Sequence, residues 1–155
     1  MDSDSVKLAI VCSEFNGEIT DRMLNSALTR CKQSGIDVRY VCRVPGAFDI
    51  PLFVKELLPK DDVDAVVTLG AIVTGDTKHD EVIASQLASS IAQLSVTHGK
   101  PVSLGVSGPG MKWEQGVERA DEYAARAVDA AVKMVSGIRQ LRKERAERDY
   151  PAIIE

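Results

Sequence analysis

The fold is decided by one stretch of the chain, AVVTLGAIV from Ala65 to Val73, followed by GDTKHD from Gly75 to Asp80. The first part is an apolar run, which predicts a buried strand. The second part is a glycine turn that leads into a long helical pattern. Strand, turn and helix in this order predict one unit of an alternating α/β fold.

The same alternation repeats on both sides of this stretch. Apolar, β-prone runs predict strands at residues 7–12, 36–44, 65–70 or slightly beyond, and 102–106. Helical patterns follow: the first is capped by Thr20 or Asp21, the second begins at Pro51, the third follows Thr77, and the last runs from Met111 to about Arg148. Residues 107–110 are expected to form a flexible link. This order predicts a parallel sheet with right-handed crossovers and helices on both faces.

The start of the third helix is a candidate anion site. Unpaired N–H groups and the positive end of the helix dipole favour phosphate there, so Gly75, Asp76 and Thr77 are expected to bind it. Thr77 and Asp80 also resemble a capping box. His79 lies in the first turn, where the dipole disfavours imidazolium and leaves the ring able to accept a proton. The alternative is a solvated histidine, but its place beside an anion site indicates an enzyme that acts on a phosphorylated small molecule.

Other candidate site residues follow other strands. Because the carboxyl ends of parallel strands meet at one edge of the sheet, the loops at residues 13–17, 45–46 and 75–77 should converge. Phe15 either fills the core or stacks on a flat heterocycle. Asp49 either binds a polyol or caps the next helix. Arg119 is either a surface residue or a phosphate ligand.

Composition narrows the functional class. The 155 residues predict a single domain, residues 1–155, with a C-terminal helical tail from about residue 137. A net charge of −4 without a basic stripe argues against a nucleic-acid partner, and no apolar run is long enough to span a membrane. The acidic start, Met1 to Ser5, does not resemble a signal peptide, so we expect a cytoplasmic protein.

The cysteines and histidines predict no metal site. Cys12, Cys31 and Cys42 lack the Cys-x-x-Cys spacing and lie in apolar patterns, which indicates reduced, buried thiols. The two histidines are far apart in the sequence.

Several motifs in a fixed order resemble the lumazine synthase family. They are Glu14-Phe15-Asn16, VPGAFDIP at residues 44–51, LGAIVTGDTKH at residues 69–79, and Glu114-Gln115 with Glu118-Arg119-Ala120. The similarity extends from about Val6 to Met134, and the turn at residues 105–111 resembles the archaeal branch of the family. The resemblance implies a flavodoxin-like three-layer sandwich with a four-stranded parallel sheet that assembles into pentamers or multiples of pentamers.

The resemblance also implies an activity. The family condenses 5-amino-6-(D-ribitylamino)uracil with 3,4-dihydroxy-2-butanone 4-phosphate through a Schiff base, phosphate elimination and ring closure. The product is 6,7-dimethyl-8-ribityllumazine, a precursor of riboflavin, and these transferases use no cofactor.

By resemblance, each candidate residue acquires a role at a site shared between subunits. Phe15 stacks on the pyrimidine, and His79 shuttles protons. The pyrimidine pocket is formed by Ala71, Ile72 and Val73, the ribityl chain is held by Ala47, Phe48 and Asp49, and the phosphate is bound by Asp76 and Thr77. The neighbouring subunit supplies Leu104 and Arg119, with Arg119 gripping the phosphate.

The sequence departs from the family at two of these positions. Asp49 occupies a position where family members usually have Glu, and Leu104 occupies a position where they frequently have Phe. One alternative is the related riboflavin synthase of archaea, whose substrate carries no phosphate, so the retained GDTKH segment argues against it. Another is a non-catalytic flavin-binding or shell-forming relative, against which His79 and Arg119 argue.

Overall fold

The computed structural model describes residues 5–155 of the chain. The prediction about a signal peptide rests mainly on residues 1–4, which lie outside the described residues. The elements are β1 (Lys7–Ser13), α1 (Gly17–Gln33), β2 (Asp37–Val44), a 3-10 turn (Ala47–Asp49), α2 (Ile50–Leu57), β3 (Ala65–Val73), α3 (His79–His98), β4 (Val102–Met111) and α4 (Trp113–Lys143). The predicted alternation of strands and helices is confirmed.

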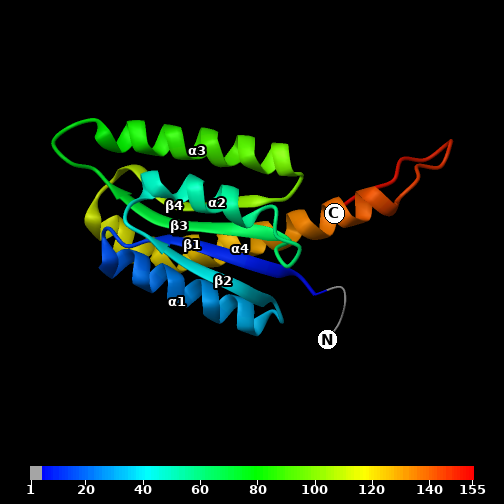
Figure 1. Ribbon diagram of the computed structural model, residues 1–155, viewed down its shortest axis with the longest axis horizontal. Coiled ribbons are helices and arrows are strands. Elements are labelled where there is room, and N and C mark those ends of the chain that lie inside the picture. Colours follow the sequence, from blue (N-terminus) through cyan, green and yellow to red (C-terminus); the bar gives the residue numbers. More distant parts are fainter. Residues whose placement is uncertain (1–4) are drawn as a thin grey trace.

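The four strands form one parallel sheet in the order β2-β1-β3-β4. Figure 1 shows the three layers, with α2 and α3 on one face of the sheet and α1 and α4 on the other. Residues of β1 alternate between the two resulting cores: Leu8 and Ile10 face one, Ala9 and Val11 the other. The chain order reverses between β1 and β3, and ligands of such folds bind beyond the strand ends at that point.

The predicted start of α1 is wrong. The helix begins at Gly17, and Asn16 precedes it in the left-handed conformation with φ of 59°. Asparagine tolerates this conformation better than most residues. Thr20, which we expected to cap the helix, is instead fully buried in the second half of its first turn.

Residues 107–110 are not a flexible link but part of β4, which continues to Met111. Two contacts explain this. β3 extends to Val73 and pairs with Met111, and Gly108 lies so close to Ile72 that an added Cβ would be 2.2 Å from the Ile72 carbonyl oxygen. Glycine also suits the φ of 99° found there.

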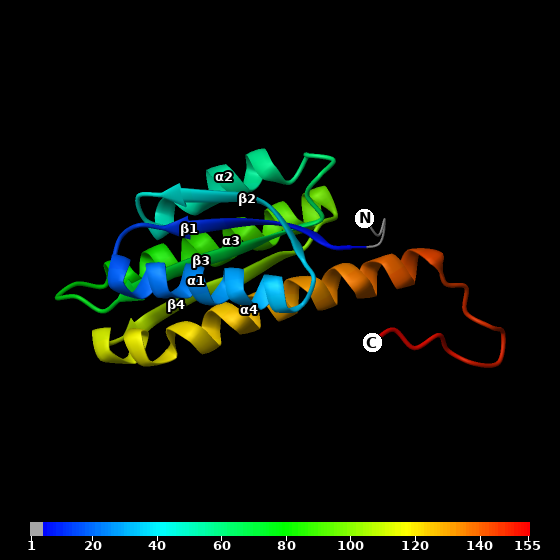
Figure 2. The same ribbon diagram turned by 90° about the horizontal axis from the view of Figure 1, so that it is seen from below.

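The first half of α4 packs on the sheet through a stripe of small side chains. Ala120, Ala124 and Ala131 are buried, whereas Met134 and Leu141 are exposed. Figure 2 shows that α4 continues past the end of the sheet and that the chain beyond it turns back toward the helix. None of the helices in the described part of the chain is long and apolar enough to cross a membrane.

Candidate functional site

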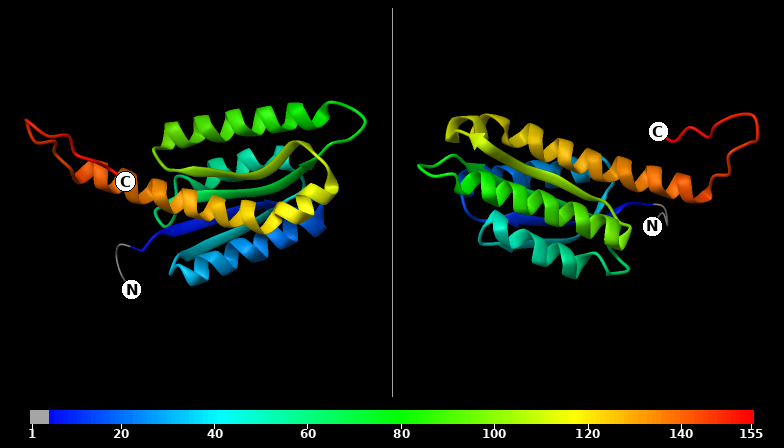
Figure 3. Two further views of the ribbon diagram at one scale, coloured as in Figure 1. Left: turned by 180° about the vertical axis from the view of Figure 1, so that it is seen from behind. Right: turned by 90° about the horizontal axis from the view of Figure 1, so that it is seen from above.

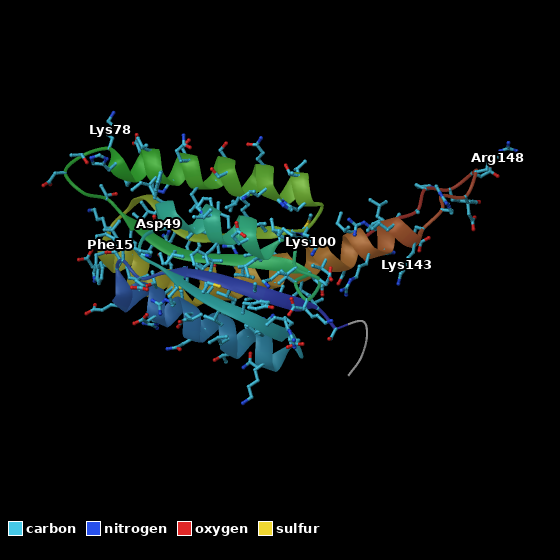
Figure 4. All side chains as sticks on the ribbon, in the orientation of Figure 1. Phe15, Asp49, Lys78, Lys100, Lys143 and Arg148 are labelled. Atoms are coloured by element: carbon cyan, nitrogen blue, oxygen red, sulfur yellow. The ribbon has the colours of Figure 1, made fainter. Side chains whose placement is uncertain are left out.

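A cavity of about 250 Å³ lies at the carboxyl ends of β1 and β3, where the strand order reverses. Nine of the candidate residues line it: Phe15, Ala47, Phe48, Ala71, Ile72, Val73, Gly75, Thr77 and His79. The predicted convergence of the three loops is therefore observed. Figure 4 places Phe15, Asp49 and Lys78 at one end of the molecule, opposite Lys143 and Arg148.

Two exposed aromatic rings stand at this cavity. Phe15 is 72% exposed and Phe48 is 67% exposed, so neither ring fills the core. The backbone around Phe15 is well anchored, because its N–H donates to the Pro45 carbonyl at 2.9 Å and the Asn16 side-chain amide donates to the Ala71 carbonyl at 2.8 Å. An exposed ring on a fixed backbone can stack on a planar ligand without rearranging the core.

Asn16 lines the cavity but was not among the predicted site residues. Its role here depends on the hydrogen bond to Ala71, 55 residues further along the chain. Two sequence signals could have found it: its place in the Glu14-Phe15-Asn16 motif, and its position between Phe15 and a glycine, which is typical of a left-handed turn residue.

The start of α3 closes the cavity on another side. Lys78 is the N-cap residue and makes no capping hydrogen bond through its side chain. The Thr77 hydroxyl accepts a long hydrogen bond of 3.4 Å from the His79 N–H. The predicted capping box of Thr77 with Asp80 is therefore wrong, because Asp80 turns inward toward other partners.

Asp80 is buried, and its carboxylate accepts hydrogen bonds from the Gly110 N–H at 3.1 Å and the Thr74 hydroxyl at 3.4 Å. The Gly110 N–H is the main cause of a lowered pKa for this carboxyl; desolvation opposes the shift, and the Glu81 N–H and Thr74 support it. The group is thus ionised at neutral pH. It places a negative charge at the start of α3, where we expected only phosphate.

Four candidate residues lie outside the cavity lining: Asp49, Asp76, Leu104 and Arg119. The Asp49 carboxylate accepts the Gly46 N–H at 2.9 Å and so closes the turn before α2. Asp76 is exposed in the loop before α3, and Arg119 is exposed on α4. Leu104 is 52% exposed on β4 and borders a separate cavity of about 390 Å³ with Tyr123 and Arg126.

The cavity offers acid–base and hydrogen-bonding groups rather than a thiol nucleophile. Cys12 lies at the end of β1, but burial raises its pKa to about 11, which keeps it a thiol. No group of three His, Cys, Asp or Glu residues within residues 5–155 could hold a metal ion. The imidazole of His79, the hydroxyl of Thr77 and the loop amides remain to bind and protonate a substrate.

Comparison with known proteins gives a consistent result. The family model described as 6,7-dimethyl-8-ribityllumazine synthase matches residues 5–139. Curated proteins with that name include one from Metallosphaera sedula, 52% identical over 91% of this chain and 93% of its own. Another, from Sulfolobus acidocaldarius, is 49% identical, and the match covers 92% of this chain and 90% of the relative. A third, from Saccharolobus solfataricus, is 52% identical, and the match covers 91% of this chain and 92% of the relative. The resemblance seen in the sequence is confirmed, and the chain belongs to the 6,7-dimethyl-8-ribityllumazine synthase family.

Proposed function

We propose that this protein is a lumazine synthase, which condenses 5-amino-6-(D-ribitylamino)uracil with 3,4-dihydroxy-2-butanone 4-phosphate in riboflavin biosynthesis. Relatives with this name match about nine-tenths of the chain. The structural observation that supports it most is the cavity between β1 and β3, where an exposed aromatic ring and an imidazole lie beside the start of α3. We expect the enzyme to act in the cytoplasm.

In this proposal the cavity aligns two substrates. Phe15 stacks on the pyrimidine, whose edge contacts β3 at residues 71–73. The turn at residues 47–49 holds the ribityl chain. The phosphate binds at Asp76 and Thr77 through backbone N–H groups and the Thr77 hydroxyl. Holding both substrates in reactive geometry can lower the barrier by about 7–11 kcal/mol.

His79 moves protons in three chemical steps. The amine of the pyrimidine attacks the ketone and water leaves, which forms the Schiff base. Phosphate is then eliminated to leave an enol, which tautomerises to a ketone, and the second amine attacks that ketone and loses water, which closes the ring. Each step transfers a proton to or from a nitrogen, carbon or oxygen atom of the substrates. An imidazole that accepts a proton in one step and donates it in the next can serve all three steps.

The proposed site is completed by a second copy of the chain. Among residues 5–155 no lysine or arginine lines the cavity, whereas the acidic residue Asp80 does. A phosphate dianion needs a compensating cation, because an unpaired charge in a cavity is costly. Arg119 lies outside the cavity of its own chain and is exposed, so we propose that a neighbouring subunit in a pentamer supplies it together with Leu104.

The function is tested by mixing the purified protein with both substrates. We expect an increase in lumazine absorbance with one phosphate released per product, and neither signal when either substrate is omitted. Conversion of added 6,7-dimethyl-8-ribityllumazine into riboflavin would instead support the riboflavin synthase alternative. Binding of lumazine or flavin without phosphate release would support a non-catalytic relative.

The shared site is tested by complementation. Analytical ultracentrifugation should give a mass five times that of the chain, or a multiple of it. Subunits with His79→Ala and subunits with Arg119→Ala, unfolded and refolded together, should recover activity because some interfaces then carry both native residues. No recovery in mixed oligomers of confirmed composition would contradict the sharing.

A further inference from the structure

Asp80 is the one charged side chain among the buried residues of the described chain, with 8% of its surface exposed. A buried charge requires strong hydrogen bonds, and such groups concentrate at functional sites. This one borders the cavity beside His79. The binding and proton-transfer roles proposed for the other site residues do not involve Asp80.

The carboxylate connects the loop between β3 and α3 with the end of β4, 30 residues further along the chain. Its own residue lies in the first turn of α3, Thr74 follows β3, and Gly110 lies near the end of β4. The Thr74 N–H also donates to the Met111 carbonyl at 2.8 Å, so the same two strand ends are joined twice. Figure 3 shows the loop between β3 and α3 projecting beyond the sheet.

We propose that Asp80 is a positioning residue for the phosphorylated substrate. Its carboxylate fixes both ends of the loop at residues 74–80, so that the loop amides and Thr77 keep the geometry that binds phosphate. The inference rests on the proposed function for the identity of that substrate. It assigns the carboxylate a role opposite to that expected from charge alone, since a bare anion would repel phosphate.

The hydrogen bonds of the Asp80 carboxylate determine whether its support of the loop outweighs its repulsion of phosphate. The carboxylate accepts the Gly110 N–H and the Thr74 hydroxyl, and the N–H of Glu81 also contributes to its stabilisation. These neutral donors stabilise the charged carboxylate in its place, and hydrogen bonds to an ionised acceptor are stronger than those between neutral groups. Removing the carboxylate therefore releases the loop more than it relieves repulsion.

The test compares Asp80→Ala with Asp80→Asn. Asp80→Ala should raise the KM for the phosphorylated substrate and the inhibition constant of inorganic phosphate by about tenfold or more, the loss expected for one charge-assisted hydrogen bond. The KM for the pyrimidine should change by less than about twofold. Asp80→Asn keeps an oxygen that can accept the Gly110 N–H, so it should restore most of the phosphate affinity.

The matched control is Glu81→Gln, which removes one carboxylate from the same turn at an exposed position. Both KM values of this variant should stay at the wild-type level.

Equal increases in both KM values for Asp80→Ala, or tighter phosphate binding by Asp80→Asn than by wild type, would overturn the proposal. If Asp80→Ala does not fold, Thr74→Val removes one partner of the carboxylate and should weaken phosphate binding alone; an unchanged phosphate constant would then refute it. Wild-type turnover in the same assay tests the proposed function separately.

Discussion

The strongest test of the proposed site is the replacement of Phe15 by alanine. With 72% of the residue exposed, the ring contributes little to packing, and its loss should change the free energy of unfolding by less than about 0.5 kcal/mol. Stacking of an aromatic ring on a nucleobase is worth about 1–3 kcal/mol. Phe15→Ala should therefore raise the KM for the pyrimidine about 5- to 150-fold while leaving the protein almost as stable as before.

Steady-state kinetics with the phosphorylated substrate at saturation measure this effect, and urea unfolding measures the stability. Phe15→Trp keeps a stacking surface and should retain a KM close to that of wild type. Phe53 on α2 provides the matched control, because it is a partly exposed phenylalanine outside the cavity lining. Phe53→Ala should leave the KM for the pyrimidine unchanged.

Two results would refute the reasoning. A KM for the pyrimidine within about twofold of wild type in Phe15→Ala would mean that the ring does not stack on the substrate. A loss of more than about 1.5 kcal/mol in unfolding free energy would mean that Phe15 belongs to the core, the alternative that the sequence left open.

Three further predictions follow from the same structure. His79→Ala should lower kcat by about 10²- to 10⁴-fold without abolishing turnover, because substrate alignment survives; a kcat like that of wild type would remove His79 from the mechanism. Arg119→Ala should raise the KM for the phosphorylated substrate by at least about tenfold; a change confined to the pyrimidine KM would contradict its role. Gly105→Ala should lower the unfolding free energy by about 3 kcal/mol, since the new Cβ would lie 2.4 Å from the Thr68 carbonyl oxygen. In Gly75→Ala no atom lies within 4 Å of the added carbon, so urea unfolding should give the same unfolding free energy as for wild type. Equal stabilities of Gly105→Ala and Gly75→Ala would refute the packing argument.

The order of the elements was predictable because each signal was local. Apolar runs marked the strands, and glycine or proline separated them from the helices. Convergence of the loops then followed from the geometry of parallel sheets alone. The exposed Phe15 and His79 could thus be assigned to one edge before any distance was known.

The errors arose where distant contacts override local preference. Residues 107–110 have the composition of a turn, yet pairing with an extended β3 holds them in a strand. Asp80 matched a capping pattern, but its partner Gly110 lies 30 residues away. Asp49 was compatible with two roles, and only the structure shows that its carboxylate binds the Gly46 N–H.

The direction of α4 has a practical consequence. In the described chain this helix runs past the sheet, and the residues after it turn back beside the helix, at the end of the molecule opposite Phe15 and Lys78. A fluorescent domain or an affinity handle fused after Glu155 would therefore leave the mouth of its own cavity unobstructed. Surface immobilisation for optical binding studies is best done through that terminus.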